Sequence, residues 1–406
     1  MIPSQTDVLV VGAGPTGLAA ACALRQGGVD VAIVDRAAEG ANTSRAAVLH
    51  ARTLEVLETV DVTHRLLAEG VVVPIFTVRD RTRVLARIDF TGLPTNHPYT
   101  VMLPQSRTES LLLARLTELG GEVHRPCAVL DATPAADFVE VLVERPSGEQ
   151  QRIRARYVIG ADGMNSRVRE TAGIGYTGGR YAQSFVLADI VMDWALPTGE
   201  VQLFFSPAGL VVVAPLPQGR HRVVATMDDA PEVITAAHVQ ALLDERGPGG
   251  ATVGSLVWGS RFRVHHRVAD RYREGGIFLA GDAAHVHSPA GGQGMNTGIQ
   301  DAVALSAILA RALSGHAHDG GLEAELDSYQ RDRRPVAERV VALTDRATRM
   351  ATLTSPMARA ARNTGMRFLT RIPAAQRRLA LELAELHDRR TFERPGTPTT
   401  GAPAAQ

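Results

Sequence analysis

Short apolar runs that end in glycine are the clearest pattern along this chain. Residues 7–11 are almost wholly apolar and lead directly into Gly12, and a second apolar run at 29–34 ends at Asp35. Runs without polar alternation are typical of parallel strands that are buried on both faces. Residues 18–26, which lie between the two runs, have the spacing of a helix. The pattern predicts a strand–helix–strand unit at the start of the chain.

The same patterns predict further elements of this first domain. Amphipathic helices are expected at 53–67 and 110–119, and buried strands at 157–160 and 276–281. Each of the two strands runs into a Gly and an Asp. After Thr297 the chain is mainly helical, and Pro335 is expected to start or kink one helix.

The pattern changes at about 71–89 and 184–273. Strands separated by Pro and Gly turns are predicted there, most clearly at 201–205, 210–214 and 220–226. Such spacing is typical of an antiparallel sheet. A second, sheet-based domain is therefore expected to interrupt the first domain in two pieces.

Composition excludes several classes of protein. The 406 residues include 43 basic and 43 acidic side chains, so no charge excess points to nucleic acid or to an anionic membrane. Every basic residue is arginine, and this excludes a Schiff-base lysine and a Walker-type phosphate lysine. No apolar run approaches the roughly 18 residues of a membrane span, and the N-terminus lacks the basic region of a signal peptide. The expected location is the cytoplasm.

Two cysteines, Cys22 and Cys127, are too few for a disulfide framework or a zinc cluster, and both are expected in the core. The pairs His265-His266 and His285/His287 make a metal site conceivable. No carboxylate or cysteine at a recognised spacing supports it, so no metal is predicted.

A glycine motif follows the first predicted strand. Gly12, Gly14 and Gly17 form the pattern GxGxxG at the start of the first helix, and Asp35 follows Gly12 by 23 residues. The first glycine permits a tight turn, the second lets a pyrophosphate approach the backbone, and the third allows close packing of helix on strand. A carboxylate at the end of the second strand can accept hydrogen bonds from ribose hydroxyls. The pattern occurs once, so it predicts one dinucleotide held in a dedicated fold.

Two further segments, at 160–169 (GADGMNSRVR) and 281–296 (GDAAHVHSPAGGQGMN), point to a known family. In this order, the three motifs resemble those of the FAD-dependent aromatic hydroxylases of the para-hydroxybenzoate hydroxylase type, which are single-component flavoprotein monooxygenases. The last segment is most similar to the branch that hydroxylates phenols and aromatic polyketides. The resemblance covers about residues 7–346. Members of that branch often carry a C-terminal thioredoxin-like domain, which is expected to be absent here.

The resemblance implies an α/β fold class: a Rossmann-like FAD-binding domain with an inserted antiparallel β-sheet substrate domain and C-terminal helices. The expected FAD-binding domain comprises 1–70, 98–176 and 275–345, and the substrate domain comprises 71–97 and 177–274. A C-terminal helical segment at 346–390 and a disordered tail at 391–406 follow.

The resemblance also implies the cofactor site. The residues expected to bind FAD are Gly12, Gly14, Pro15, Thr16, Gly17, Asp35, Arg36, Arg45, Gln105, Asp162, Gly281, Asp282, Pro289, Gly292, Gly294, Met295 and Asn296. Among them, Arg45 is expected to contact the phosphates, Asp162 to serve a site shared with nicotinamide, and Asp282 to bind the ribityl chain. Residues 289–296 are expected beside the isoalloxazine ring, with a helix from about Gly298. Arg167 and Arg169 are either a surface pair or part of an NADPH-binding segment.

The implied reaction is hydroxylation of a small aromatic substrate. NADPH or NADH reduces FAD, and dioxygen forms a flavin C4a-hydroperoxide that attacks an electron-rich ring. No side chain is predicted as catalytic, because motifs do not determine the residue that deprotonates the substrate. Baeyer–Villiger insertion, epoxidation and a redox-silent FAD-bound cyclase stay open as alternatives. The expected oligomeric state is a monomer or a homodimer.

Overall fold

The apolar runs form neighbouring strands of one parallel sheet. In the computed structural model, which describes residues 2–40, 46–315 and 321–387, this sheet has the order β17-β18-β11-β1-β2-β8. Strands β18 to β8 are parallel, and β17 is antiparallel to β18. Their bounds are β1 Gln5–Val11, β2 Val31–Val34, β8 Val123–His124, β11 Gln150–Gly160, β17 Arg273–Glu274 and β18 Ile277–Leu279. The predicted strand–helix–strand unit is confirmed as β1, α1 (Pro15–Gln26) and β2.

Helices pack on this sheet and bury it. Val8, Leu9 and Val10 of β1 have no exposed surface, as expected for a strand covered on both faces. Helix α1 packs against α4 (Gln105–Glu118) and α7 (Gly294–Leu313), and α7 packs against α8 (Gly321–Ala351). Strands β9 (Ala128–Pro134) and β10 (Val139–Glu144) extend from β11 as an antiparallel meander, against which α5 (Arg167–Thr171) rests.

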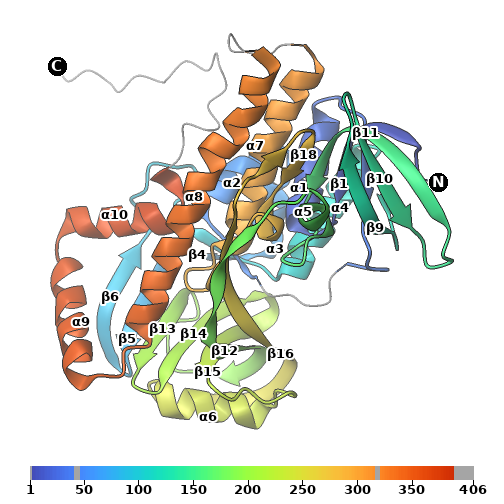
Figure 1. Cartoon of the computed structure of the whole chain (residues 1–406). Helices are drawn as coiled ribbons and strands as arrows, with labels where there is room; N and C mark the ends of the chain where they lie inside the picture. The colour runs from blue at the N-terminus through green and yellow to red at the C-terminus, as the bar shows by residue number, and fades with distance from the viewer. Residues whose placement is uncertain (1, 41–45, 316–320, 388–406) are drawn as a thin grey trace, which may run out of the picture.

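A second sheet lies below the first in Figure 1. Its order is β19-β16-β12-β15-β14-β13-β5-β6, and every pair is antiparallel except β13–β5. The bounds are β5 Ile75–Asp80, β6 Arg83–Asp89, β12 Tyr176–Asp193, β13 Glu200–Ser206, β14 Gly209–Leu216, β15 Arg220–Met227, β16 Thr252–Ala269 and β19 His285–Val286. A short turn, η1 (Pro217–Gly219), joins β14 to β15, and α6 (Ala236–Arg246) packs on β13, β14 and β16. The fold class is the predicted α/β architecture.

Smaller elements connect the two sheets. The strands β3 (Val48–Leu49), β7 (Thr100–Met102) and β4 (Val71–Val73) form a three-stranded sheet. At the C-terminal side, α9 (Pro356–Leu369) and α10 (Pro373–Leu383) pack against β6. The predicted tail at 391–406 lies outside the described residues. Among the residues that are described, no helix is long and apolar enough to cross a lipid bilayer.

Two predictions of helices were wrong in detail. The helix expected at 53–67 is two helices, α2 (Ala51–Glu58) and α3 (Thr63–Glu69), because Asp61 between them adopts a left-handed φ of 60°. Helix α7 begins at Gly294 rather than near Gly298. Its first turn contains glycine, a poor helix former, and for this reason the sequence pattern did not indicate that turn. Pro335 lies inside α8, so of the two expected alternatives it does not start a helix, and a kink at this position stays a prediction.

Candidate functional site

The carboxyl ends of three parallel strands meet at one edge of the first sheet. The chain goes from β1 to β2 on one side and returns to β11 on the other, so the strand order reverses between β1 and β11. Open α/β sheets bind ligands in the crevice at such a point. The glycine motif follows β1, Asp162 follows β11, and the turn η2 (Gly281–Ala283) follows β18. Motifs that are far apart in the sequence therefore lie together.

The first and third glycines of GxGxxG are required by close backbone contacts. Gly12 has φ +102°, and a methyl group on it would lie 2.4 Å from the carbonyl oxygen of Ala161. A methyl group on Gly17 would lie 1.8 Å from the carbonyl oxygen of Gly12. Gly14 differs, because a methyl group there would meet no atom of the described residues within 4 Å. The motif thus packs tightly at Gly12 and Gly17, whereas the backbone at Gly14 faces open space.

The start of α1 suits a negatively charged group in that space. Gly14 is the N-cap and no side chain caps the helix, while Pro15 in the first turn has no N–H to satisfy. The N–H groups of a first helical turn lack partners inside the helix and carry the positive end of its dipole. This arrangement binds phosphates in dinucleotide-binding folds. The residues present fit the diphosphate of a dinucleotide cofactor.

Asp35 lies beside this turn at the end of β2. Its carboxylate accepts hydrogen bonds from the backbone N–H of Ala13 (2.6 Å) and of Ala37 (2.7 Å). Arg125, which follows β8, donates to the carbonyl oxygen of Ala13 (3.0 Å) and lies 3.9 Å from the Asp35 carboxylate. Arg125 was missed by sequence reasoning because it belongs to no motif. Only the pairing of β8 with β2 brings it to the site.

Thr16 joins the first motif to the third. A methyl group on either Gly281 or Gly298 would lie 2.6 Å from the Thr16 hydroxyl oxygen. Thr16 is therefore enclosed between η2 and the first turns of α7. The contact places Asp282, which is exposed, next to the start of α1. Both glycines allow the two helices and the turn to approach this closely.

Asp162 caps a helix as well as lying at the sheet edge. Its carboxylate accepts from the Ser166 hydroxyl (2.5 Å) and from the backbone N–H groups of Arg167 (2.7 Å) and Val168 (3.2 Å). Burial raises the pKa of Asp162, and these hydrogen bonds oppose the shift. Arg169 is buried and donates to the carbonyl oxygens of Ala283 and Met164, both at 3.0 Å. Arg167 and Arg169 are therefore not a surface pair, since Arg169 joins the second motif to the third.

The glycine-rich loop before α7 is held by Asn296. Its amide donates to the carbonyl oxygens of Val48 (2.9 Å) and Gly292 (2.8 Å), and its oxygen accepts from the His50 N–H (2.8 Å). The loop packs tightly, because a methyl group on Gly292 would lie 2.0 Å from Val48. The His50 ring contacts the Gly291 carbonyl oxygen (2.8 Å), and burial lowers the pKa of His50 to about 4. The side chain of Asn296 is thus used inside the protein.

Residues around Ala46 connect this loop to the second sheet. Gln105 accepts from the Ala46 N–H (3.2 Å), and Arg222 of β15 donates to the Ala46 carbonyl oxygen (2.7 Å). Arg222 is itself held by a buried, two-point ion pair with Asp189 (2.7 and 2.8 Å). The segment from Ala46 to His50 therefore lies between the second sheet and the glycine-rich loop.

The other predicted cofactor residues have simpler surroundings. Arg36 is exposed, and Pro289, Gly294 and Met295 are half-buried in the loop before α7 or at its start. Arg45 lies outside the described residues. The role of each predicted residue toward FAD stays a prediction.

A buried ion pair joins α7 to α8. Asp301 accepts from Arg333 (2.7 Å) and lies 2.6 Å from a ring nitrogen of His285, and all three are almost fully buried. Burial alone would raise the pKa of Asp301, but Arg333 and His285 outweigh it and hold the pKa below its usual value. This cluster joins α8, α7 and β19 behind the glycine-rich loop.

The C-terminal segment reaches the same loop. Gln293 donates to the carbonyl oxygen of Leu383 (3.1 Å), and the backbone N–H of Arg52 donates to that of Ala384 (3.2 Å). Glu385, in a left-handed conformation, accepts from Gln300 of α7. Burial raises the pKa of Glu385 to about 8, and Gln300 only partly opposes it. No sequence motif marks these contacts.

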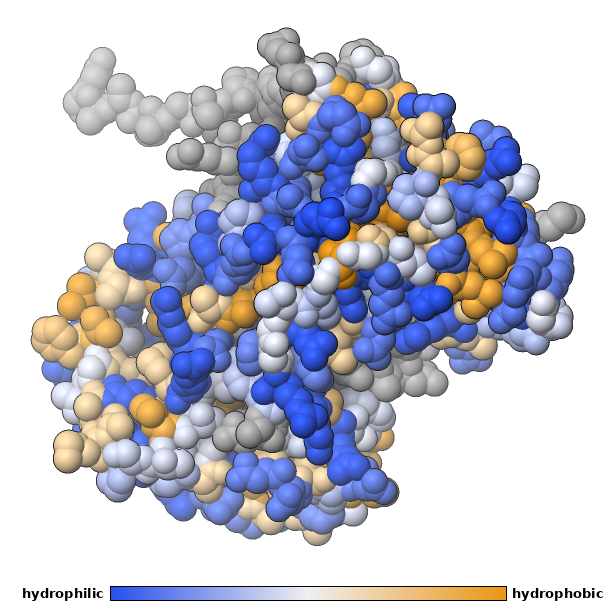
Figure 2. Space-filling model, viewed as in Figure 1, coloured by the Kyte–Doolittle hydropathy of each residue, from blue (hydrophilic) through white to orange (hydrophobic). Residues whose placement is uncertain are grey.

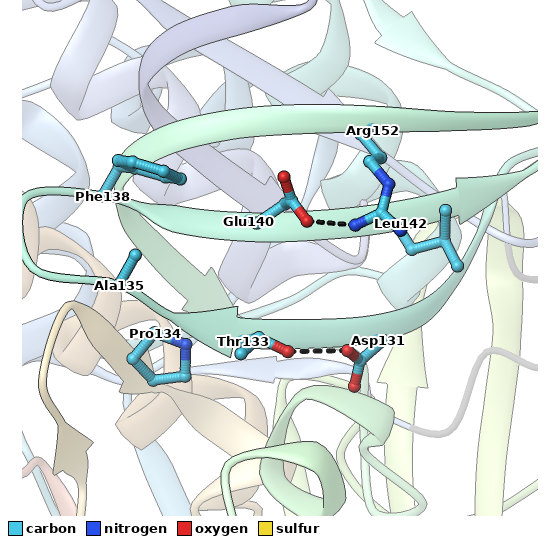
Figure 3. Close-up of a pocket in the computed structure, with 8 residues that line it drawn as sticks. All are labelled: Asp131, Thr133, Pro134, Ala135, Phe138, Glu140, Leu142 and Arg152. Atoms are coloured by element: carbon cyan, nitrogen blue, oxygen red, sulfur yellow. Dashed lines mark hydrogen bonds and ion pairs between the residues drawn. The ribbon is translucent and has the colours of Figure 1, made fainter.

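Two buried histidines close to the loop, His50 and His287, are neutral at neutral pH. Burial lowers the pKa of His287 to about 4, and its Nδ1 lies 3.0 Å from the Ser288 carbonyl oxygen. No group of three or more His, Cys, Asp or Glu side chains within the described ranges could hold a metal ion. A hollow of about 280 Å³ lies elsewhere, on the β9–β11 meander (Figure 3). Its lining includes Asp131, Glu140 and Arg152, and none of the predicted cofactor residues line it.

Comparison with known proteins agrees with this geometry. A family described as "FAD binding domain" matches residues 5–344. The chain is 38% identical over 389 residues to 6-methylpretetramide 4-monooxygenase of Streptomyces rimosus, a match that covers 93% of this chain and 68% of that protein.

Solved structures show the same fold. p-Nitrophenol 4-monooxygenase from Pseudomonas putida DLL-E4 superposes with a TM-score of 0.85 at 25% identity, and the match covers 96% of this chain and all of that one. A Diels-Alderase from the biosynthetic pathway of pyrroindomycins superposes with a TM-score of 0.77 at 27% identity, over 94% of this chain and 80% of that one.

The first prediction concerns the open space at Gly14. We expect Gly14→Ala to lower FAD affinity by at least about tenfold, because the added methyl group occupies the space left for a phosphate. Its unfolding temperature without FAD should stay close to that of the wild type, since φ at Gly14 is −77°. Titration of the FAD-free protein, followed by flavin fluorescence, measures the affinity. Gly92→Ala, at an equally open glycine, is the matched control. Unchanged FAD affinity in Gly14→Ala would refute the phosphate position.

The second prediction concerns Asn296. Asn296→Asp keeps the shape but replaces the two N–H donors to Val48 and Gly292 with a carboxylate oxygen. Two buried carbonyls lose their partners, at about 1–3 kcal/mol each, so both the unfolding temperature and FAD affinity should fall. Thermal unfolding with and without FAD measures both. Asn96→Asp, at an exposed position outside the three motifs, should change neither. Equal behaviour of the two variants would contradict the role of Asn296 in holding the loop.

The third prediction concerns pH. The pKa of Glu385 is about 8 in the folded protein against an ordinary value of 4.5, so the folded state holds an extra proton between these values. Stability from this group is present at low pH and is lost as the pH rises through about 8. Glu385→Gln cannot ionise and should unfold at a higher temperature than the wild type at about pH 9, with little difference at about pH 5. Glu382→Gln, nearby on α10, is the control. An identical pH dependence in wild type and Glu385→Gln would show that Glu385 ionises normally.

Proposed function

The chain belongs to the FAD binding domain family, whose named relatives are flavin-dependent aromatic monooxygenases, and we propose that it hydroxylates a phenolic or polyketide-type aromatic ring with NAD(P)H and dioxygen. FAD is its cofactor. The observation that carries the proposal is the meeting of the three motifs at one sheet edge. Gly12, Asp162 and Asp282 follow three different strands, and all lie around the uncapped start of α1.

The residues that would hold FAD are those already described. The N–H groups at the start of α1 would bind the phosphates, Asp35 the adenosine ribose and Asp282 the ribityl chain. The uncapped N-terminus of α7, after the Gly291–Gly292 turn, would stabilise negative charge on a flat ring beside it. When bound, FAD supplies the transfer of electrons from NAD(P)H to dioxygen and so an electrophilic oxygen atom.

The chain's own residues would position the substrate and exclude water. The second sheet is fixed to the segment beside the glycine-rich loop through Asp189, Arg222 and Ala46. A substrate ring held by the second sheet would therefore lie at a set distance from that loop. A water-excluding site prevents wasteful loss of the activated oxygen. The relatives' names support the substrate class: 6-methylpretetramide is a polyketide, and p-nitrophenol is a phenol.

Reduction requires a second nucleotide to reach the site. The sequence contains one GxGxxG motif that follows a strand, so NAD(P)H would bind transiently and without a Rossmann fold of its own. A conformational step between reduction and oxygen transfer follows from this arrangement. We propose the cytoplasm as the setting, where NAD(P)H is supplied and where thiols such as Cys22 and Cys127, both free, stay reduced.

The proposal predicts that NADPH bleaches the bound flavin. We expect anaerobic mixing with NADPH to remove the flavin absorbance, and to do so faster with one class of aromatic compound than with others. A panel of simple phenols and of polycyclic quinones, followed by stopped-flow absorbance, measures the rate. The expected product after air is admitted carries one oxygen atom from dioxygen for each NADPH consumed. Bleaching at equal rates without and with every aromatic compound would contradict substrate recognition.

A second candidate is a cyclase that holds FAD without using it for redox chemistry. It is favoured by the Diels-Alderase that shares this fold over 94% of the chain. The two candidates differ in one readout, because a cyclase forms product while the flavin stays oxidised and no NADPH is consumed. Product with the mass of the substrate would replace the monooxygenase proposal with the cyclase.

A further inference from the structure

Helix α9 packs on the β5–β6 hairpin through a side that is mainly polar. Asn363 donates to the Asp80 carboxylate (2.8 Å), and Arg359 lies 3.9 Å from the same group. Arg362 is buried, donates to the carbonyl oxygen of Met350 (2.7 Å) and rests over the Phe205 ring at 5.1 Å. Charged and amide side chains thus attach this helix to the protein, together with Met366, which packs on the apolar cluster around Leu85 and Phe205. An amphipathic helix of a globular protein normally buries its apolar side instead.

The apolar side of α9 faces outward. Met357 is 83% exposed and Phe368 65%, and Ala361 and Thr364, which are also exposed, continue the same helical face between them. Leu369 is 55% exposed at the end of the helix. The outermost helix at the left of Figure 1 is α9, and Figure 2 shows apolar surface gathered along that edge. A face of this kind marks a site of interaction rather than an ordinary surface.

Charge indicates what covers this face. Residues 352–381 contain six arginines and no Asp or Glu. Arg359 and Arg362 point inward and Arg378 lies 3.3 Å from the Glu382 carboxylate, whereas Arg371 and Arg377 are exposed close to the apolar face. A second copy of the chain would bring another set of arginines against the first, which like charges oppose. A partner whose surface is negatively charged and whose interior is apolar fits both the exposed arginines and the apolar face of α9.

We propose that α9 and the start of α10 form a docking surface for an anionic phospholipid bilayer. Met357, Phe368 and Leu369 would enter the interface between headgroups and acyl chains, and the exposed arginines would lie at the level of the lipid phosphates. The binding is peripheral, because no described helix can span a bilayer. The surface is independent of the cofactor site and is tested without turnover.

The test is sedimentation of the full-length, FAD-loaded protein with vesicles. We expect binding to vesicles of phosphatidylglycerol mixed equally with phosphatidylcholine, little binding to pure phosphatidylcholine, and weaker binding as NaCl rises from about 0.1 to 0.5 M. The double variant Met357→Gln, Phe368→Gln should lower the bound fraction by at least about fivefold. Arg371→Gln with Arg377→Gln should remove the preference for the anionic lipid. Val233→Gln, at a residue that is 73% exposed elsewhere, is the matched control and should bind as the wild type does.

Each contrary result is distinct. Absence of binding to the anionic vesicles, or binding that survives in the Met357→Gln, Phe368→Gln variant, would overturn the proposal. Light scattering on the same samples identifies the competing occupant. A wild-type dimer that this double variant converts to a monomer would show that a second copy of the chain covers α9. Unchanged flavin absorbance and unfolding temperature confirm that the variants are folded.

Discussion

The close approach of backbone at the carboxyl ends of β1, β11 and β18 is the constraint on which the rest of the structure depends. Gly12 touches Ala161, Gly17 touches Gly12, and Gly281 and Gly298 enclose Thr16. Any side chain at these glycines would separate the strands, the turn η2 or the helices α1 and α7. These contacts leave Gly14 with no atom of the described residues within 4 Å of an added methyl group, and the uncapped end of α1 begins there. A tightly closed turn and an open anion site are therefore parts of one arrangement.

The rest of the fold holds a second loop beside this site. Asn296 holds the glycine-rich loop to Val48 and His50, and Arg222 holds the neighbouring Ala46 to the second sheet. The ion pair of Asp301 with Arg333 joins α7, which follows this loop, to α8. Leu383 and Glu385 of the C-terminal segment form hydrogen bonds with Gln293 and Gln300 at the start of α7. Elements from the whole length of the chain thus converge on residues 289–296. In an oxygenase this rigidity has a chemical purpose, since the ring, the oxygen and the substrate must meet without water.

The sequence predicted the features that depend on local backbone, and missed those that depend on distant partners. Strands that end in glycine, the GxGxxG turn and the family motifs are visible because glycine is required where no side chain fits. Arg125 and Glu385 carry no such sign, because they reach the site only through strand pairing and C-terminal packing. Asp162 was recognised by its motif, but its capping of α5 was not. The basic, outward-facing α9 was hidden because 43 acidic residues elsewhere balance the total charge.

A structure of the protein with FAD bound would test the central claim most directly. The account predicts the diphosphate over Gly14 at the start of α1, the adenosine ribose at Asp35 and the ring beside the Gly291–Gly294 run. It also predicts that Asn296 keeps its hydrogen bonds to Val48 and Gly292. A dinucleotide bound elsewhere, or a ring that displaces the loop from Val48, would contradict it.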